Sequence, residues 1–181
     1  MKNIYIEHTD NIIINNDLKE LIKYSDNQMK EISLKAWSLL SYILLEKHNI
    51  ILNKDMIYYN EHNKPYLKDN SVYFNLSHSK NIVAIIVDRK ECGIDIEYID
   101  YSKTIDKITK KILSIKEQKK LKYKFDKHKY FFKLWTRKET YYKMQGTGII
   151  YNQLNKNIKY KNIKSYIYKY NNDKFFVSFT K

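Results

Sequence analysis

The sequence predicts an α+β fold built from two similar halves, residues 1–90 and residues 91–181. The order of the expected elements, a strand, then helices, then strands, occurs once before residue 90 and once after it. Hydrophobic residues make up 43% of the chain, which is enough for a packed core and argues against disorder. A length of 181 residues fits one large domain or two small ones. We therefore expect two α+β halves joined near residue 90.

Helix caps and apolar runs define the elements of the first half. Asp17 has the position of an N-cap for a first helix, and Ser25 or Asp26 for a longer helix through Trp37. Strands are expected where β-branched and aromatic residues cluster. In order, the predicted elements are a strand at 3–8, helices at 17–24 and 26–47, and strands at 56–59, 72–76 and 82–87.

The second half starts after the polar residues 88–91, which predict a hairpin between the strands on either side of them. Ser114-Ile115-Lys116-Glu117 has the form of a capping box. Asp126 is the expected N-cap of a long helix that ends at Gly146. In order, the predicted elements are a strand at 93–99, helical segments from about 103, from 114 and over 127–145, and two strands between 158 and 180.

The formal net charge of +14 makes the chain strongly basic, and much of the excess lies between residues 103 and 143. One interpretation is attraction of an acidic partner or of a phosphate-rich ligand. The other is compositional, because nearly all the cations are lysines among many Asn, Ile and Tyr residues, as an AT-rich genome would encode. The charge alone leaves both interpretations open.

One cysteine and the lack of long apolar runs bear on location. Cys92 is the only cysteine, so no internal disulfide is possible, which fits a reducing cytosol. Residues 1–8 lack the apolar stretch of a signal peptide, and the apolar run at 38–45 is too short to cross a bilayer. We expect a soluble cytoplasmic protein without a membrane partner.

Two carboxylates alternate in the strand at 93–99. Asp95 and Glu97 flank Ile96, so both point to one face, with Cα atoms roughly 7 Å apart. An Asp-x-Glu pair alone is more often the polar face of an ordinary strand. If the two side chains converge, they offer the oxygen ligands that Mg²⁺ prefers.

A third carboxylate favours a metal site over an ordinary strand. Glu139 lies about 40° from Trp135 on the helical wheel, within an arc of aromatic residues. A carboxylate there is partly desolvated, and it needs a counter-charge, hydrogen bonds or a metal. Lys143 follows one turn later on the same side. Asp95, Glu97 and Glu139 are therefore predicted to hold a hard cation with positions open to phosphate oxygens, and Lys143 to neutralise charge on the same phosphate.

Three blocks in order resemble the 4′-phosphopantetheinyl transferases. They are Phe74-Asn75-Leu76-Ser77-His78-Ser79, Gly93-Ile94-Asp95-Ile96-Glu97, and the stretch 132–148 with Trp135, Lys138, Glu139, Lys143, Gly146 and Gly148. Lys64-Pro65 is similar to the family's Gly-Lys-Pro, with Asn63 in place of the glycine. Because Asp95 follows a whole preceding half, the resemblance is to the surfactin-type branch. The short trimeric holo-acyl-carrier-protein synthases place this Asp near the N-terminus.

The resemblance implies a monomeric pseudo-dimer with its active site between the halves. It also implies a reaction: a serine of an apo carrier protein attacks the β-phosphate of coenzyme A, the 4′-phosphopantetheine arm is transferred, and adenosine 3′,5′-bisphosphate leaves. Coenzyme A is then the co-substrate and Mg²⁺ the cofactor, with Mn²⁺ as the alternative ion. The partner is an acidic helical carrier protein, and no nucleic acid is expected.

The resemblance also assigns roles. Asp95, Glu97 and Glu139 would hold Mg²⁺ on the pyrophosphate, with Lys143 on the same group. The coenzyme A contacts would come from the matching positions of the three blocks and of Lys-Pro: Lys64, Pro65, Ser77, His78, Asp95, Lys138 and Lys143. The general base is Glu139, a metal-bound water or Glu117. Glu117 also has a purely structural reading, as the second half of the capping box with Ser114.

The sequence departs from the family at the long helix of the first half. It offers only lysines there, with Ser41 near the place of an expected arginine, and Lys23, Lys30 or Lys35 are the candidates for a phosphate contact. Apolar residues at the end of the catalytic helix, Met144 and Ile149-Ile150, are candidates for docking the carrier's helix.

Two other functions remain as alternatives. A basic nucleic-acid-binding protein would account for the charge and the 18 tyrosines, but it leaves the three carboxylates unexplained. A Mg²⁺-dependent phosphohydrolase would use the same acids and turn over phosphate esters without a carrier protein.

Overall fold

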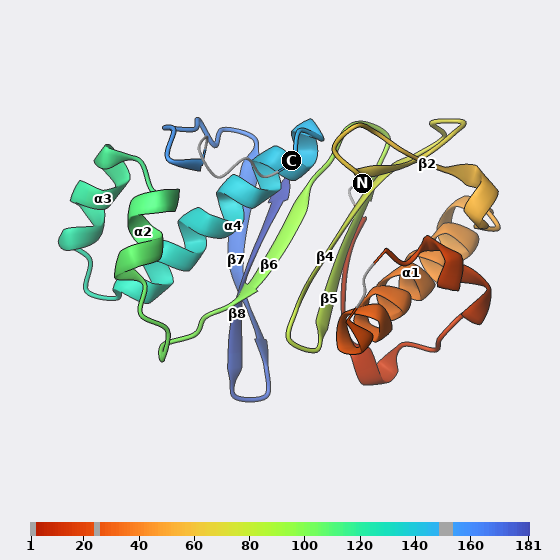
Figure 1. Ribbon diagram of the computed structural model, residues 1–181, viewed down its shortest axis with the longest axis horizontal. Coiled ribbons are helices and arrows are strands. Elements are labelled where there is room, and N and C mark those ends of the chain that lie inside the picture. Colours follow the sequence, from red (N-terminus) through yellow and green to blue (C-terminus); the bar gives the residue numbers. More distant parts are fainter. Residues whose placement is uncertain (1–2, 24–25, 149–153) are drawn as a thin grey trace.

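Three small antiparallel sheets and the helices that cover them form the described part of the chain, which confirms the α+β prediction (Figure 1). The structure is a computed structural model that describes residues 3–23, 26–148 and 154–181. The helices and strands run in this order: β1 Asn3–His8, α1 Asn27–His48, β2 Ile57–Tyr59, β3 Pro65–Leu67, β4 Tyr73–Ser79, β5 Ile82–Asp88, β6 Ile94–Tyr98, α2 Asp106–Ile112, α3 Ile115–Lys122, α4 Lys127–Gln145, β7 Ile163–Tyr170 and β8 Asp173–Thr180.

The first sheet has the order β1-β5-β4, with β5 in the centre. Val83, Ile85 and Val87 of β5 belong to the core cluster that also contains the apolar residues of α1. The alternate residues, Ile82, Ala84 and Ile86, belong to a second cluster with residues of β6 and β8. Burial on both faces explains why β5 reads as an unbroken apolar run rather than an alternating one.

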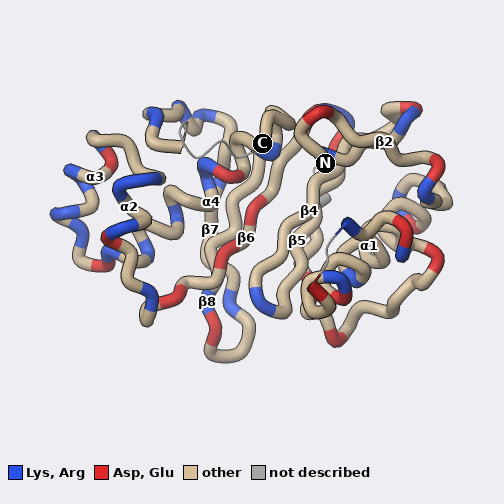
Figure 2. The backbone as a smooth tube through the Cα atoms, in the orientation of Figure 1, with Lys and Arg blue, Asp and Glu red and all other residues tan. Residues whose placement is uncertain are grey.

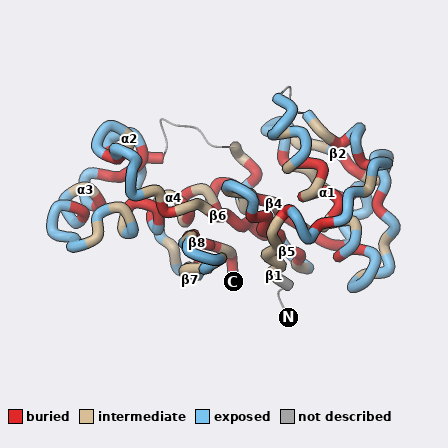
Figure 3. Tube along the Cα trace, turned by 90° about the horizontal axis from the view of Figure 1, so that it is seen from below, coloured by how far each residue is buried: buried red, intermediate tan, exposed pale blue. Residues whose placement is uncertain are grey.

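The third sheet has the order β6-β8-β7, with β8 in the centre. Phe175 and Val177 face the cluster shared with β5, whereas Phe176 packs with Phe131 and Phe132 of α4. The described chain therefore stacks as α1, first sheet, third sheet and α4, and Figure 3 shows the buried residues concentrated along this stack. The second sheet is the short β2–β3 pair beside α1.

The predicted hairpin across residues 88–91 is wrong. β5 pairs with β1 on one edge and with β4 on the other, so it has no free edge for β6. β6 pairs instead with β8, with Asp95 opposite Ser178. The polar connection carries the chain from one sheet to the next.

Most predicted helix ends are confirmed by their caps. Asp26 accepts a hydrogen bond from the Met29 amide at 2.9 Å, and Asp126 accepts one from the Lys129 amide at 2.8 Å. Gly146 ends α4 at φ 67°, a left-handed conformation that favours glycine. Ser114 and Glu117 form the capping box of α3. Ser25, the alternative cap of α1, lies outside the described residues.

Two predictions for the first half need correction. Asp17 does not cap an α-helix; Asn15 caps a 3₁₀ helix, Asn16–Leu21, and accepts from the Asp17 amide at 3.0 Å. Ile22 is extended, so this helix ends before residue 24. The sequence prediction also missed β3, because three residues starting at Pro65 are too short for a periodic signal.

Among the described residues, no helix is both long and apolar enough to cross a membrane.

Candidate active site

Three carboxylates from two elements converge beside the first sheet. Asp95 and Glu97 project from the same face of β6, and Glu139 projects from α4, which packs on the third sheet. One oxygen from each lies within 4.8 Å of the others. The structure thus brings together all three residues that the sequence pattern predicted for a cation.

Lys143 lies in the same cluster, one helical turn after Glu139. Its Nζ is 2.6 Å from Asp95 Oδ1 and 3.8 Å from Glu139 Oε2. It also donates to the Ser77 hydroxyl at 2.9 Å. One ammonium group therefore faces three carboxylates.

The pKa shifts show that the cluster holds too much negative charge for its surroundings. Burial, followed by the charge of Asp95, raises the pKa of Glu97 to about 7. The same two causes raise the pKa of Glu139 well above its ordinary value. Burial alone would lower the pKa of Lys143, but Asp95 and Glu139 outweigh it and raise that pKa.

A divalent cation fits this arrangement. Asp95 Oδ2 is buried and has no hydrogen-bond partner, although an unpaired buried carboxylate oxygen is costly. Three convergent carboxylates with one lysine leave a net negative site made entirely of oxygen donors, the donor set that Mg²⁺ prefers. Asp95, Glu97 and Glu139 are the residues that would hold the ion.

Side chains of β4 join the first sheet to β6. Asn75 Oδ1, Ser77 Oγ and Ser79 Oγ accept hydrogen bonds from the amides of Ile94, Ile96 and Tyr98 at 2.9, 3.3 and 3.0 Å. The two serine hydroxyls also donate, Ser77 to Asp95 Oδ1 at 2.9 Å and Ser79 to Glu97 Oε2 at 3.3 Å. We call this set of contacts the β4–β6 seam. It fixes how β6 lies alongside β4 and thereby the positions of Asp95 and Glu97.

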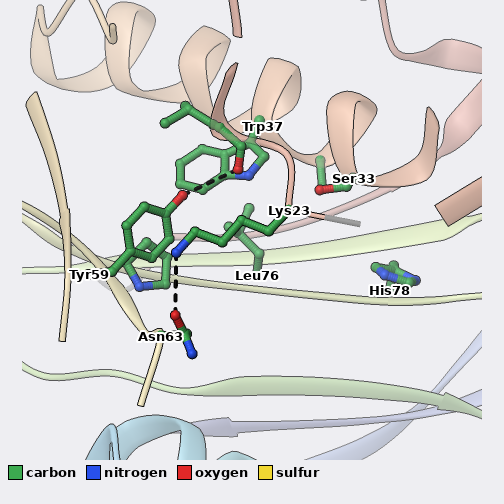
Figure 4. A pocket seen from close by; sticks show the side chains of 10 residues that line it. Lys23, Ser33, Trp37, Tyr59, Asn63, Leu76 and His78 are labelled. Atoms are coloured by element: carbon green, nitrogen blue, oxygen red, sulfur yellow. Dashed lines mark hydrogen bonds between the residues drawn. The ribbon is translucent and has the colours of Figure 1, made fainter. Parts of the chain in front are cut away.

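His78 lies between the two serines in β4 and lines a pocket of about 440 Å³. Figure 4 shows this pocket, which is bounded by side chains from α1, from the end of the 3₁₀ helix Asn16–Leu21 and the chain just after it, from the β2–β3 region and from β4: Leu21, Lys23, Ser33, Ala36, Trp37, Tyr59, Asn63, Pro65, Leu76 and His78. Burial, and then the charge of Lys143, lowers the pKa of His78, so its ring is neutral at pH 7. Lys143 contacts Ser77, the residue before His78, so the pocket and the carboxylate cluster are neighbours.

Of the three lysines considered for a phosphate contact, Lys23 is the one that lines the pocket. Its Nζ lies 3.3 Å from the centre of the Tyr59 ring and donates to Asn63 Oδ1 at 3.3 Å (Figure 4). Lys35 instead pairs with Glu31 at 3.1 Å, and Lys30 is exposed and does not line the pocket. The sequence reading missed the pocket's aromatic walls, although Ser33 and Trp37 share one helix face at i and i+4.

The structure does not bring Lys138 and Glu117 to the cluster. Lys138 is fully buried, and its Nζ donates to the carbonyls of Leu154 and Lys156 at 2.7 and 2.9 Å and lies 2.9 Å from Glu117 Oε2. Glu117 closes the capping box and also accepts from the Tyr160 hydroxyl at 3.1 Å. These contacts tie α3 and α4 to the segment after residue 154.

Lys64 also has its ammonium group committed to protein atoms. The residue is 8% exposed, and Nζ contacts Glu91 Oε2 at 2.7 Å, Met144 O at 3.2 Å and Cys92 O at 3.3 Å. Pro65, the next residue, does line the pocket. Met144 is half-buried against Gly93, and Ile149-Ile150 lies outside the described residues.

Comparison with known proteins adds an independent finding. Residues 91–179 match the family model described as the 4′-phosphopantetheinyl transferase superfamily. The chain is similar to 4′-phosphopantetheinyl transferase HetI of Nostoc sp., 36% identical over 98 residues, which covers 50% of this chain and 41% of that protein. It is 38% identical over 92 residues to the 4′-phosphopantetheinyl transferase of Bacillus subtilis, which covers 49% and 40% of the two chains.

A third relative is the 4′-phosphopantetheinyl transferase gsp of Aneurinibacillus migulanus, 35% identical over 119 residues. That match covers 62% of this chain and 49% of the relative. The matched stretches therefore span less than half the length of each of these three relatives.

Proposed function

The C-terminal half of the chain, residues 91–179, belongs to the 4′-phosphopantetheinyl transferase superfamily, and from this we propose that the protein is a holo-carrier-protein synthase. It would transfer the 4′-phosphopantetheine arm of coenzyme A to a serine of an apo carrier protein and release adenosine 3′,5′-bisphosphate. The observation that carries the proposal is the convergence of Asp95, Glu97 and Glu139 with Lys143 beside a pocket.

We also propose that residues 1–90 and 91–181 are two similar α+β halves of one pseudo-dimeric monomer, with the active site between them. In support, α1 packs with the sheet β1-β5-β4, and α4 packs with the sheet β6-β8-β7. The β4–β6 seam, which lies between these two sheets, carries two of the three carboxylates.

Asp95, Glu97 and Glu139 are the proposed ligands of Mg²⁺. When bound, the ion supplies positive charge to the pyrophosphate that is split, where charge develops during phosphoryl transfer. Lys143, held by Asp95 and Ser77, adds a second positive group at the same place. Phosphoryl transfer depends mainly on such positioning and charge stabilisation, so these residues suffice for the chemistry.

The pocket is the proposed site for the nucleotide part of coenzyme A. Trp37, Pro65 and Leu76 offer apolar surface for a base, while Lys23 and the neutral ring of His78 offer donors for a phosphate. Its position next to Lys143 would place the pyrophosphate between the pocket and the carboxylates. Lys64 and Lys138 are not proposed to bind coenzyme A, because the ammonium group of each already donates hydrogen bonds to protein atoms.

Glu139 is the proposed acceptor of the serine proton. Glu117, the other candidate side chain, is 6% exposed and uses its two oxygens on Ser114, Tyr160 and Lys138. Glu139 lies instead in the acidic cluster next to Lys143, so of these two side chains it is the one beside the proposed pyrophosphate site.

The basic face of the second half is the proposed approach path for an acidic carrier protein. Twelve lysines and three acidic residues lie between residues 101 and 133, and Figure 2 shows these cations along α2, α3 and the start of α4. Ile115, Tyr123 and Phe125 are exposed on the same segment and can contact apolar residues of a docked helix. Complementary charge of this kind speeds encounter and favours the correct partner.

Intact-mass spectrometry of an apo acyl or peptidyl carrier protein tests the proposal. Incubation with the protein, coenzyme A and Mg²⁺ is expected to add one phosphopantetheine arm, and both EDTA and Glu139→Ala are expected to abolish the addition. No mass gain on either carrier from a folded protein would contradict the proposal. Release of phosphate from simple esters without any carrier would point to a phosphohydrolase instead.

A further inference from the structure

The end of α4 is held by side chains from the β2–β3 hairpin. The last carbonyls of a helix have no partner within the helix and need donors from elsewhere. Here Met144 O accepts from Lys64 Nζ at 3.2 Å, and Gly146 O accepts from Asn60 Nδ2 at 2.7 Å. Two side chains that are 80 residues or more away in sequence therefore cap the helix that carries Glu139 and Lys143.

Lys64 is suited to holding this helix end rather than a ligand. Its side chain is 7% exposed, and Nζ contacts Glu91 Oε2 at 2.7 Å, Met144 O at 3.2 Å and Cys92 O at 3.3 Å. These three acceptors match the three protons of an ammonium group, so none is left for a phosphate. A cation at a helix C-terminus also interacts favourably with the helix dipole.

Asn60 is held rigidly in the tight connection between β2 and β3. Its side-chain Oδ1 accepts from the backbone amides of His62 and Lys64 at 3.0 and 2.9 Å. Its backbone amide donates to Lys64 O at 3.0 Å. Asn63 takes up the left-handed conformation, φ 63°, that the turn requires. Oδ1 of Asn60 is bound within the hairpin and Nδ2 is bound to Gly146 O, so the side chain links the hairpin directly to the end of α4.

Gly146 and Gly93 show how closely the surrounding chain fits this helix end. A Cβ at Gly146 would lie 2.8 Å from the Tyr66 hydroxyl and 2.9 Å from Asn60 Nδ2. A Cβ at Gly93, just before β6, would lie 2.4 Å from Thr140 O and 2.7 Å from the Met144 amide nitrogen. The last turns of α4 therefore lie directly between the start of β6 and the hairpin.

Lys143 is the residue just before the held carbonyl of Met144. Its Nζ reaches Asp95 Oδ1 at 2.6 Å and Ser77 Oγ at 2.9 Å, distances that tolerate little displacement of the helix end. A shift of this turn by about 1 Å directly away from β6, with the lysine side chain held in its present conformation, would stretch both contacts beyond hydrogen-bond distance. The hydrogen bonds to Met144 O and Gly146 O therefore also keep Lys143 next to Asp95.

We propose that Lys64 and Asn60 are positioning residues, which fix the last turn of α4 and through it the Lys143–Asp95 pair. This role differs from the direct coenzyme A contact that the resemblance implies for Lys64. That Lys64 and Asn60 hold the end of α4 does not depend on the proposed function. Only the expected effect on transfer kinetics rests on the proposed function.

Hydrogen–deuterium exchange of the ligand-free protein tests whether Lys64 and Asn60 hold the end of α4. Lys64→Met and Asn60→Ala are each expected to speed exchange of the amides at the end of α4, about residues 141–146, at least tenfold and to leave α1 unchanged. Lys68→Met, an exposed lysine that follows β3, is the matched control and should change nothing. Unchanged exchange at the end of α4 in both variants would overturn the proposal, and so would an equal increase in α1 and α4.

Transfer kinetics separate positioning from ligand contact. Since the pocket keeps its lining, Lys64→Met is expected to lower kcat at least tenfold and to leave KM for coenzyme A within about twofold. A tenfold rise in KM for coenzyme A with kcat unchanged would overturn the proposal and indicate that Lys64 contacts the nucleotide directly. If the wild-type protein transfers nothing, the proposed function fails, while the exchange result still decides the role of Lys64 and Asn60.

Discussion

At the scale of single residues, burial rather than residue type decides what the charged side chains do. Lys64, Lys138 and Lys143 all match the family blocks, yet only Lys143 has carboxylates of the acidic cluster as partners. The other two bind backbone carbonyls and one glutamate each. The sequence predicted that all three matter and that Lys143 lies beside Glu139, but it carried no information on the partners of Lys64 and Lys138, because these lie 16 or more residues away in the chain.

The raised pKa of Glu97 makes the stability of the metal-free protein depend on pH. A carboxyl whose pKa is about 7 in the folded state contributes stability that is complete below its unfolded pKa and is lost as pH rises through 7. Glu97→Gln removes the charge, so in EDTA the variant should exceed wild type at pH 8 by roughly 1–3 kcal/mol and match it near pH 5.

Thermal unfolding measures this difference, at about 2–4 °C per kcal/mol for a chain of this size. Exposed Glu46→Gln is the control. Added Mg²⁺ at pH 8 should reverse the order by stabilising wild type and not Glu97→Gln. An equal gap between Glu97→Gln and wild type at pH 5 and pH 8 would show that Glu97 is not under electrostatic strain.

At the scale of elements, local signals predicted the helix ends and missed the strand pairing. Asp126 and Gly146 bound α4 because capping is a property of a few neighbouring residues. The partner of β6 depends instead on β8, which lies some 80 residues further along the chain. The face shared by Asp95 and Glu97 was predictable from alternation alone. The contacts of the β4–β6 seam that hold the two carboxylates in place were not, because they depend on where β4 lies in the fold.

The β4–β6 seam should make Ser77 costly to replace. Ser77→Ala removes the acceptor for the Ile96 amide and a contact of Lys143, and it leaves a buried N–H without a partner. The expected loss of unfolding free energy is about 1–3 kcal/mol in urea titrations. Exposed Ser71→Ala, which loses only a contact to Asp69, serves as reference. Equal stability of these two variants would mean that water replaces the hydroxyl in the seam.

At the scale of the whole molecule, charge is distributed unevenly over the chain. The twelve lysines between residues 101 and 133 lie on the side of α2 and α3 and away from α1 (Figure 2). The sequence predicted this concentration from composition, and the α+β class from the order of elements. The relation between the two halves stays a prediction, since one sequence does not reveal similarity in shape.

This charge distribution predicts a salt-dependent encounter with an acidic carrier protein. Lys119→Glu with Lys120→Glu, both exposed on α3, should raise KM for the carrier at least tenfold at low salt and leave KM for coenzyme A unchanged. The charge-matched control is the double substitution Lys30→Glu with Lys47→Glu, both exposed on α1. Equal effects of the α3 and α1 substitutions at 50 mM and 500 mM NaCl would refute steering by the basic face.

The β4–β6 seam has a consequence for self-association. β4 and β6 are edge strands of their sheets, and an open strand edge is a template for pairing with another chain. In this fold the edge amides of Ile94, Ile96 and Tyr98 in β6 are occupied by an asparagine and two serines rather than by another strand. The two sheets stay separate, yet these amides on the β6 edge are not left open. The β4 side chains next to the carboxylates therefore also keep this edge of β6 from pairing with a strand of another copy.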